Sequence, residues 1–125
     1  MKRIVITGGS GRFGNIIKKH KTNYKLFFPT KNQLDILNTI KIQRYLKRVK
    51  PQILIHLAGL SRPMKIHEGD IQKSIDLNII GTANITKACF KNKVKLIYFS
   101  TNYVYPGDLG NYKEDSPLLP TNNYA

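Results

Sequence analysis

The sequence predicts an α/β fold in which a doubly wound parallel sheet carries helices on both faces. Short apolar runs alternate along the chain with segments whose apolar residues recur at helical spacing. The runs are continuously apolar, as in strands buried on both faces, and helical crossovers between such strands imply that they are parallel. A glycine-rich turn joins the first run to the first helical segment. Right-handed crossovers then place a ligand at the carboxyl ends of the strands.

Seven elements are expected in order. The expected strands are residues 3–7, 25–28, 52–57 and 95–100, and the expected helices are residues 12–19, 38–49 and 70–91. Pro29 stops the second strand, Asn38 can cap the second helix, and Pro51 follows the end of that helix. One side of the longest helix is apolar; it consists of Ile71, Ile75, Ile79 and Ala83. The turn-rich segment after Ser100 is expected to lie over the active site.

Length and composition are those of one folded domain. The chain has 125 residues, of which 41% are hydrophobic, enough for a single core. No stretch reaches the roughly 20 consecutive apolar residues of a membrane span, and the apolar N-terminal run is too short for a signal peptide. The lone Cys89 excludes an internal disulfide and favours a reducing, cytoplasmic setting, and no residues have metal-ligand spacing.

The formal net charge of +14 is unusually high for a chain of this length. By itself it would favour a nucleic-acid partner or an anionic membrane. The lysines are scattered, however, and lack the interleaved aromatic residues that single-strand binders use. We therefore expect a solvated basic surface, with no nucleic-acid and no membrane partner. Retardation of random oligonucleotides in a gel would test the nucleic-acid alternative.

The glycine-rich turn spans residues 7–14, Thr-Gly-Gly-Ser-Gly-Arg-Phe-Gly. Its glycines permit a tight turn and a close approach to a pyrophosphate, and the following helix offers free N–H groups to the phosphates. Its position between a strand and a helix makes this motif a strong sign of dinucleotide binding. The expected contact residues are Gly8, Ser10, Gly11, Arg12, Phe13 and Gly14.

The residues after the second strand favour NADP(H) over NAD(H). An NAD site usually has an acidic residue at that strand end to bind the ribose 2′-hydroxyl, and here the strand is followed by Pro29, Thr30 and Lys31. Asp35 comes too late for that role. Thr30 and Lys31 could instead receive a 2′-phosphate with the help of Arg12, although Lys31 could equally be an ordinary surface lysine.

Several motifs in chain order resemble the extended short-chain dehydrogenase/reductase family, whose fold is the NAD(P)-binding Rossmann fold. They are Gly8-x-x-Gly11-x-x-Gly14, Leu34-Asp35-Ile36, His56-Leu57-Ala58-Gly59, Asn78-Ile79-Ile80-Gly81-Thr82, Ser100-Thr101-Asn102-Tyr103-Val104 and Asn123-Tyr124-Ala125. The set covers the whole chain and is far more specific than any single motif. It implies that residues 1–125 are the N-terminal part of such a domain, with the fold incomplete at the C-terminus and the C-terminal substrate domain absent.

The resemblance also implies roles for individual residues. Asp35 and Ile36 would contact the adenine, and Leu57, Ala58 and Gly59 would lie beside the adenosine ribose and the pyrophosphate. Asn78 would brace the active site. Thr101 would be the catalytic hydroxyl and Tyr124 the first residue of the Tyr-x-x-x-Lys motif. The lysine of that motif would lie beyond residue 125, so this polypeptide is expected to have little or no activity alone.

Within the family, Thr101-Asn102-Tyr103-Val104 followed by Tyr112-Lys113-Glu114 is most similar to the dTDP-4-dehydrorhamnose reductases. That resemblance implies a 4-keto nucleotide-sugar substrate, a role in polysaccharide biosynthesis, and a parent protein that can form a homodimer. Arg62 and Tyr103 are weaker candidates for substrate contacts, since a plain basic loop and packing explain them equally well.

Two alternatives stay open. One is a nucleotide-sugar epimerase or dehydratase, although dehydratases have an acid after the active threonine and this chain has Asn102. The other is a non-catalytic dinucleotide-binding module. Among the histidines, His56 is expected to have a structural or ribose-side role rather than one in acid–base chemistry, and His20 and His67 are expected to lie on the surface.

Overall fold

The computed structural model describes residues 1–125 and contains one four-stranded sheet. The strands are β1 (Arg3–Thr7), β2 (Lys25–Phe27), β3 (Ile53–His56) and β4 (Lys95–Tyr98). Their order is β2-β1-β3-β4, and every pairing is parallel. The chain leaves β1 toward one neighbour and later returns to its other side, which creates a switch point between β1 and β3. The predicted α/β fold is confirmed, with strand ends that differ by one or two residues.

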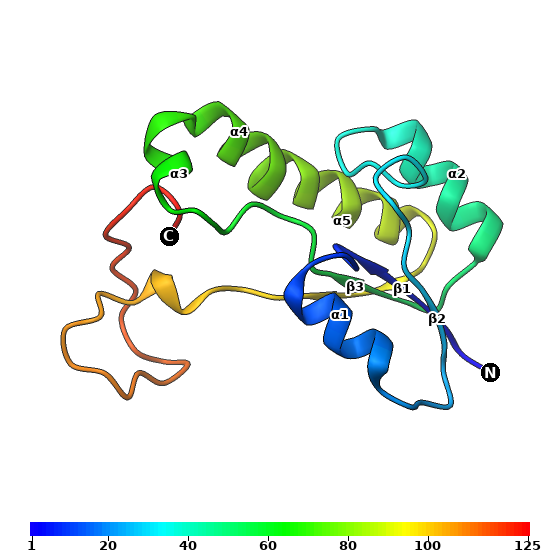
Figure 1. The fold of residues 1–125 in the computed structure, drawn as a ribbon, viewed down its shortest axis with the longest axis horizontal. Coiled ribbons are helices and arrows are strands. Elements are labelled where there is room, and N and C mark those ends of the chain that lie inside the picture. The colour runs from blue at the N-terminus through cyan, green and yellow to red at the C-terminus, as the bar shows by residue number, and fades with distance from the viewer.

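Helices cover both faces of this sheet (Figure 1). Helix α1 (Arg12–Lys19) lies on one face, and α2 (Thr39–Val49) lies on the other together with the long helical segment. The predicted cap of α2 is present, because the Asn38 side chain accepts a hydrogen bond of 2.9 Å from the Lys41 N–H. Lys50 ends α2 in the left-handed conformation, directly before Pro51.

The predicted long helix is a continuous helical segment with a π-helical turn inside it. It consists of α4 (Ile71–Ile75), the π turn Asp76–Ile80 and α5 (Gly81–Lys91). Asp70 caps its start by accepting a hydrogen bond from the Lys73 N–H. Sequence periodicity did not reveal the π turn, a feature that is frequent at functional sites.

The apolar side of this segment that the sequence singled out does not face the core. Ile71, Ile75 and Ile79 are exposed, with 60% of the Ile79 surface accessible. A second apolar side, which includes Ile85 and Ala88, packs on the sheet instead. Helical spacing alone does not distinguish two apolar sides of one helix, because both repeat with the same period.

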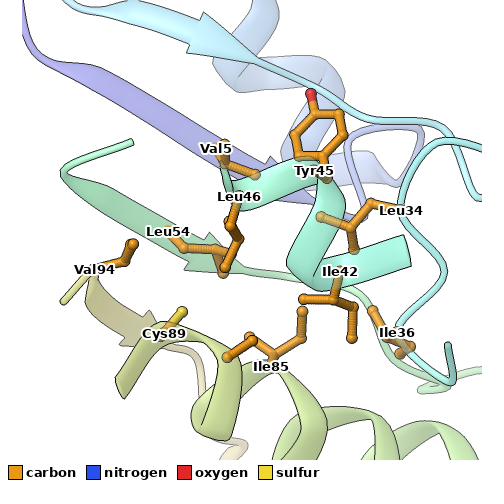
Figure 2. Packing of buried hydrophobic residues seen from close by; sticks show 11 residues of the cluster. Val5, Leu34, Ile36, Ile42, Tyr45, Leu46, Leu54, Ile85, Cys89 and Val94 are labelled. Atoms are coloured by element: carbon orange, nitrogen blue, oxygen red, sulfur yellow. The ribbon is translucent and has the colours of Figure 1, made fainter. Parts of the chain in front are cut away.

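The core lies between the sheet and the pair formed by α2 and α5 (Figure 2). Its buried residues are Val5, Leu34, Ile36, Ile42, Tyr45, Leu46, Leu54, Ile85, Ala88, Cys89 and Val94. Burial raises the pKa of the Cys89 thiol to about 11, so this cysteine acts as a packed apolar group rather than a nucleophile.

Two short helices were not predicted. Helix α3 (Lys65–Gly69) precedes the long helical segment, and a single 3-10 turn (Asn102–Val104) follows β4. Residues 105–125 contain neither helix nor strand. Within them Tyr112 organises a local turn by accepting hydrogen bonds from the N–H groups of Gly107, Asp108 and Leu109. None of the helices is both long and apolar enough to cross a membrane.

Candidate functional site

The glycine-rich turn makes a close backbone contact with the end of β3. Gly8 has φ +69°, and a Cβ atom there would lie 2.7 Å from the backbone nitrogen of Ala58. Gly14 packs on Gly9, where a Cβ atom would lie 2.6 Å from the Gly9 Cα. These contacts hold α1 against the turn and bring the turn next to the loop after β3, as the glycine pattern predicts.

A buried hydrogen-bond network fixes the same two strand ends. The Thr7 hydroxyl oxygen accepts from the N–H groups of Leu57 and Ala58 at 3.2 Å each, and it lies 2.7 Å from His56 Nδ1. His56 Nε2 is 3.3 Å from the Thr82 hydroxyl. Burial lowers the pKa of His56 to about 4, so the ring is neutral at pH 7. His56 therefore has the structural environment that the sequence suggested.

A hollow of about 510 Å³ opens beside this turn. Ten of the residues expected to bind a cofactor line it: Gly8, Ser10, Gly11, Thr30, Lys31, Asp35, Ile36, Leu57, Ala58 and Gly59. The first turn of α1 has no acidic side chain, and no side chain caps Gly11. The backbone N–H groups in the first turn of α1 are therefore free to donate to an anionic group such as a diphosphate.

Lys18 and Lys31 make one end of the hollow basic, and Lys18 was not predicted. Lys18 lines the hollow together with Thr30 and Lys31, whereas Arg12 does not. The Lys18 ammonium lies 5.2 Å from the centre of the Phe28 ring. Gly14 faces the turn, and a residue four positions later lies on the same face of a helix. That spacing was the available signal for Lys18, and Arg12 is not among the residues that line this hollow.

Asp35 contributes the one carboxylate of this hollow. Its side chain accepts a hydrogen bond of 3.0 Å from the Leu37 N–H, which uses part of its acceptor capacity within the loop. The hollow therefore has two lysines, Lys18 and Lys31, and one carboxylate that is already partly engaged.

Asn78 lies in the π turn and holds the loop that follows β3. Its side chain accepts from the Leu60 N–H at 2.7 Å and donates to the Leu60 carbonyl at 2.8 Å. It does not line the first hollow, so its structural contact is with the loop rather than with the basic end. A bracing role was what the resemblance implied.

A second hollow, of about 540 Å³, continues from the first. The two hollows share Leu57, Ala58 and Gly59. Thr101 and Tyr124 both line the second hollow, and so do Phe13 and Asn78. Thr101 starts the 3-10 turn, where its hydroxyl oxygen accepts a hydrogen bond of 3.2 Å from the Tyr103 N–H. The fold thus places Thr101 and Tyr124, which are 23 positions apart in the sequence, in the lining of one hollow.

Arg62 and Tyr103 line a further hollow together with Pro63 and Met64. The Tyr103 ring packs edge-on against the Tyr124 ring, with centroids 5.6 Å apart. Their shared position connects the two weaker substrate candidates to the region of Thr101 and Tyr124.

His67 was expected on the surface, and that expectation is wrong. Its side chain is fully buried, and its Nδ1 atom lies 2.6 Å from the Ser74 hydroxyl. His20, in contrast, is exposed. No three His, Cys, Asp or Glu side chains cluster in a way that could hold a metal ion.

The family described as the RmlD substrate binding domain matches residues 1–125, which is the whole chain. This chain belongs to that family. Its members are related to nucleotide-sugar reductases, and a dTDP-4-dehydrorhamnose reductase from Bacillus anthracis in complex with NADP illustrates the similarity. That structure superposes with a TM-score of 0.92 at 30% identity, over 99% of this chain and 45% of the other.

Two curated relatives of this chain have different names and so different described functions. Methionine adenosyltransferase 2 subunit beta from Xenopus tropicalis is 30% identical over 99% of this chain and 40% of its own length. GDP-L-colitose synthase from Yersinia pseudotuberculosis is 30% identical over 85% of this chain and 35% of its own length. This family member therefore spans less than half the length of these relatives.

Proposed function

We propose that this chain is the cofactor-binding part of an NADP(H)-dependent reductase that acts on a 4-keto nucleotide sugar, similar to dTDP-4-dehydrorhamnose reductase. One observation carries the proposal: a hollow with a glycine turn and a basic end runs directly into a second hollow lined by Thr101 and Tyr124. A dinucleotide bound along this path would extend from the basic end toward the two hydroxyl groups. The Bacillus anthracis reductase in complex with NADP supports the choice of cofactor.

Each group of residues then has a distinct task. The free N–H groups at the start of α1 bind the diphosphate, and Thr30, Lys31 and Lys18 bind the 2′-phosphate. When bound, NADPH supplies the hydride that reduces the keto carbon. Tyr124 donates a proton to the keto oxygen, and the Thr101 hydroxyl donates a hydrogen bond to that oxygen and fixes its position.

The outer parts of the site complete the proposal. Arg62 and Tyr103 contact the nucleotide sugar, and Asn78 keeps the loop after β3 in place. Residues 1–125 form the N-terminal part of the cofactor-binding domain, and the substrate domain belongs to a longer parent protein, which forms a homodimer in the cytoplasm.

Calorimetric titration of the chain with NADPH and with NADH tests the cofactor assignment. We expect NADPH to bind more tightly. Lys18→Ala should weaken NADPH binding by about tenfold, the equivalent of one lost charge-assisted contact, and should leave NADH binding unchanged. Lys21→Ala, an exposed lysine just beyond α1, is the matched control. Tighter NADH binding would refute the preference, and binding of neither nucleotide would refute the function.

The second candidate is a non-catalytic NADP(H)-binding subunit of a larger assembly. It is favoured by the 30% identity, over nearly the whole chain, to a protein named as a subunit of methionine adenosyltransferase. Turnover of a keto nucleotide sugar by the parent protein distinguishes the two candidates. A parent protein that binds NADPH but fails to oxidise it in the presence of such sugars would support the subunit.

A further inference from the structure

His67 is a buried titratable residue that the proposed reaction does not use. It lies in α3, where its imidazole has no exposed surface. Its Nδ1 atom is hydrogen-bonded to the Ser74 hydroxyl at 2.6 Å, and its Nε2 atom is buried without a hydrogen-bond partner. A buried polar atom without a partner is costly, and its presence needs an explanation.

The imidazole packs against the ring of Tyr124. The two ring centroids are 4.8 Å apart, and the planes are inclined by 47°. Tyr103 contacts the same phenol ring edge-on, with centroids 5.6 Å apart. Tyr124 is thus in contact with one ring from α3 and another from the turn after β4, which restricts the directions in which its hydroxyl can point.

The chain before Tyr124 is also attached to α3. The Asn123 N–H and side-chain amide donate to the Glu68 carboxylate at 3.2 Å and 2.8 Å. The same amide donates to the His67 carbonyl at 3.4 Å. These contacts span 55 residues of sequence and bring the tyrosine next to the imidazole.

A hydrogen-bond chain connects the imidazole to Asn78. The Asn78 amide donates to the Ser74 oxygen at 3.5 Å, and the same Ser74 oxygen lies 2.6 Å from His67 Nδ1. Asn78 is itself held by two hydrogen bonds to the backbone of Leu60. The position of the imidazole is therefore fixed from the side of Ser74, which leaves its ring packed against Tyr124.

We propose that His67 is a positioning residue for Tyr124: the imidazole, held by Ser74, fixes the plane of the phenol ring within the second hollow. The chemical purpose of this positioning rests on the proposed function, because it matters to catalysis only if Tyr124 donates the proton. The ring contact itself is a property of the chain and can be tested without cofactor.

Hydroxyl-radical footprinting of the 125-residue chain, read by mass spectrometry, tests the contact, with the exposed Tyr24 as internal reference. His67→Gln keeps a group that can bond to Ser74 but removes the ring. His67→Phe keeps a ring but removes the bond. We expect Tyr124 to lose its protection in His67→Gln and to retain most of it in His67→Phe. His20→Gln, at an exposed histidine, should leave the protection unchanged.

The opposite pattern would overturn the proposal. If His67 only anchored α3 through Ser74, His67→Gln would stay protected and His67→Phe would lose protection. Equal protection in all variants would show that the ring contact does not hold Tyr124. If His67→Phe does not fold, the comparison of His67→Gln with wild type still separates the two alternatives, because loss of Tyr124 protection in His67→Gln supports the ring contact and retained protection contradicts it. Calorimetry with NADP+ on the same samples separates the two proposals, because absent NADP+ binding refutes the function while the footprint still reports on the contact.

Discussion

Gly8 is the residue at which the turn between β1 and α1 tolerates least change. It has φ +69°, and a Cβ atom would lie 2.7 Å from backbone atoms of Leu57 and Ala58. Gly8→Ala should therefore lower the free energy of unfolding by about 1–3 kcal/mol, because alanine is strained in the left-handed conformation. The added methyl group should also push the turn away from β3 and so abolish tight NADPH binding. Gly107→Ala is the matched control, since Gly107 has φ +84° with nothing within 4 Å. Urea unfolding and NADPH titration measure both effects, and equal losses in the two variants would contradict the contact.

His56 makes the stability of the fold depend on pH. Burial lowers its pKa to about 4 from 6.5, so between these values the unfolded chain binds a proton that the folded chain does not. The contribution of His56 to stability is complete above pH 6.5 and is lost as the pH falls toward 4. His56→Gln should reduce the pH dependence of the free energy of unfolding by up to about 1.4 kcal/mol per pH unit. Urea unfolding at several pH values measures it, and an unchanged dependence would contradict the low pKa.

At the scale of elements, the long helical segment offers a direct test of which side faces the core. Ile85 is completely buried, whereas 60% of Ile79 is exposed on the opposite apolar side. Ile85→Ala should lower the free energy of unfolding by about 2–5 kcal/mol, while Ile79→Ala should change it by less than about 0.5 kcal/mol. Denaturant unfolding measures both variants. A larger loss at Ile79 would mean that the segment is rotated relative to the structure.

The elements also show what sequence can and cannot predict. The three main helices were predictable because each is long enough to show helical spacing, and the four strands were predictable because each forms a continuous apolar run. Helix α3 was not, since five residues carry too little periodicity. The burial of His67 depends on Ser74, seven residues away, and on the segment around Tyr124, which no local pattern encodes.

Part of the candidate site was predictable from the sequence and part was not. The residues of the glycine turn and of the loop after β3 were predictable because their spacing along the chain fixes their position at the strand ends. Lys18 was missed although it lies four residues after Gly14, on the helix face that packs on Gly9. The glycine motif predicts the turn alone, and only its extension by one further helical turn would have indicated Lys18.

For the whole molecule, the charge balance predicts how stability responds to salt. The chain has 21 Lys and Arg against 7 Asp and Glu, so repulsion among cations opposes the compact state. Raising the ionic strength from 0.01 M to 0.15 M shortens the Debye length from about 30 Å to about 8 Å and screens that repulsion. The urea midpoint should therefore rise with sodium chloride, and sucrose at equal osmolality serves as the control for excluded-solute effects. A midpoint that falls with salt would mean that attractive ion pairs outweigh the repulsion. The lysines and arginines would then be paired with Asp and Glu side chains of this chain rather than only solvated.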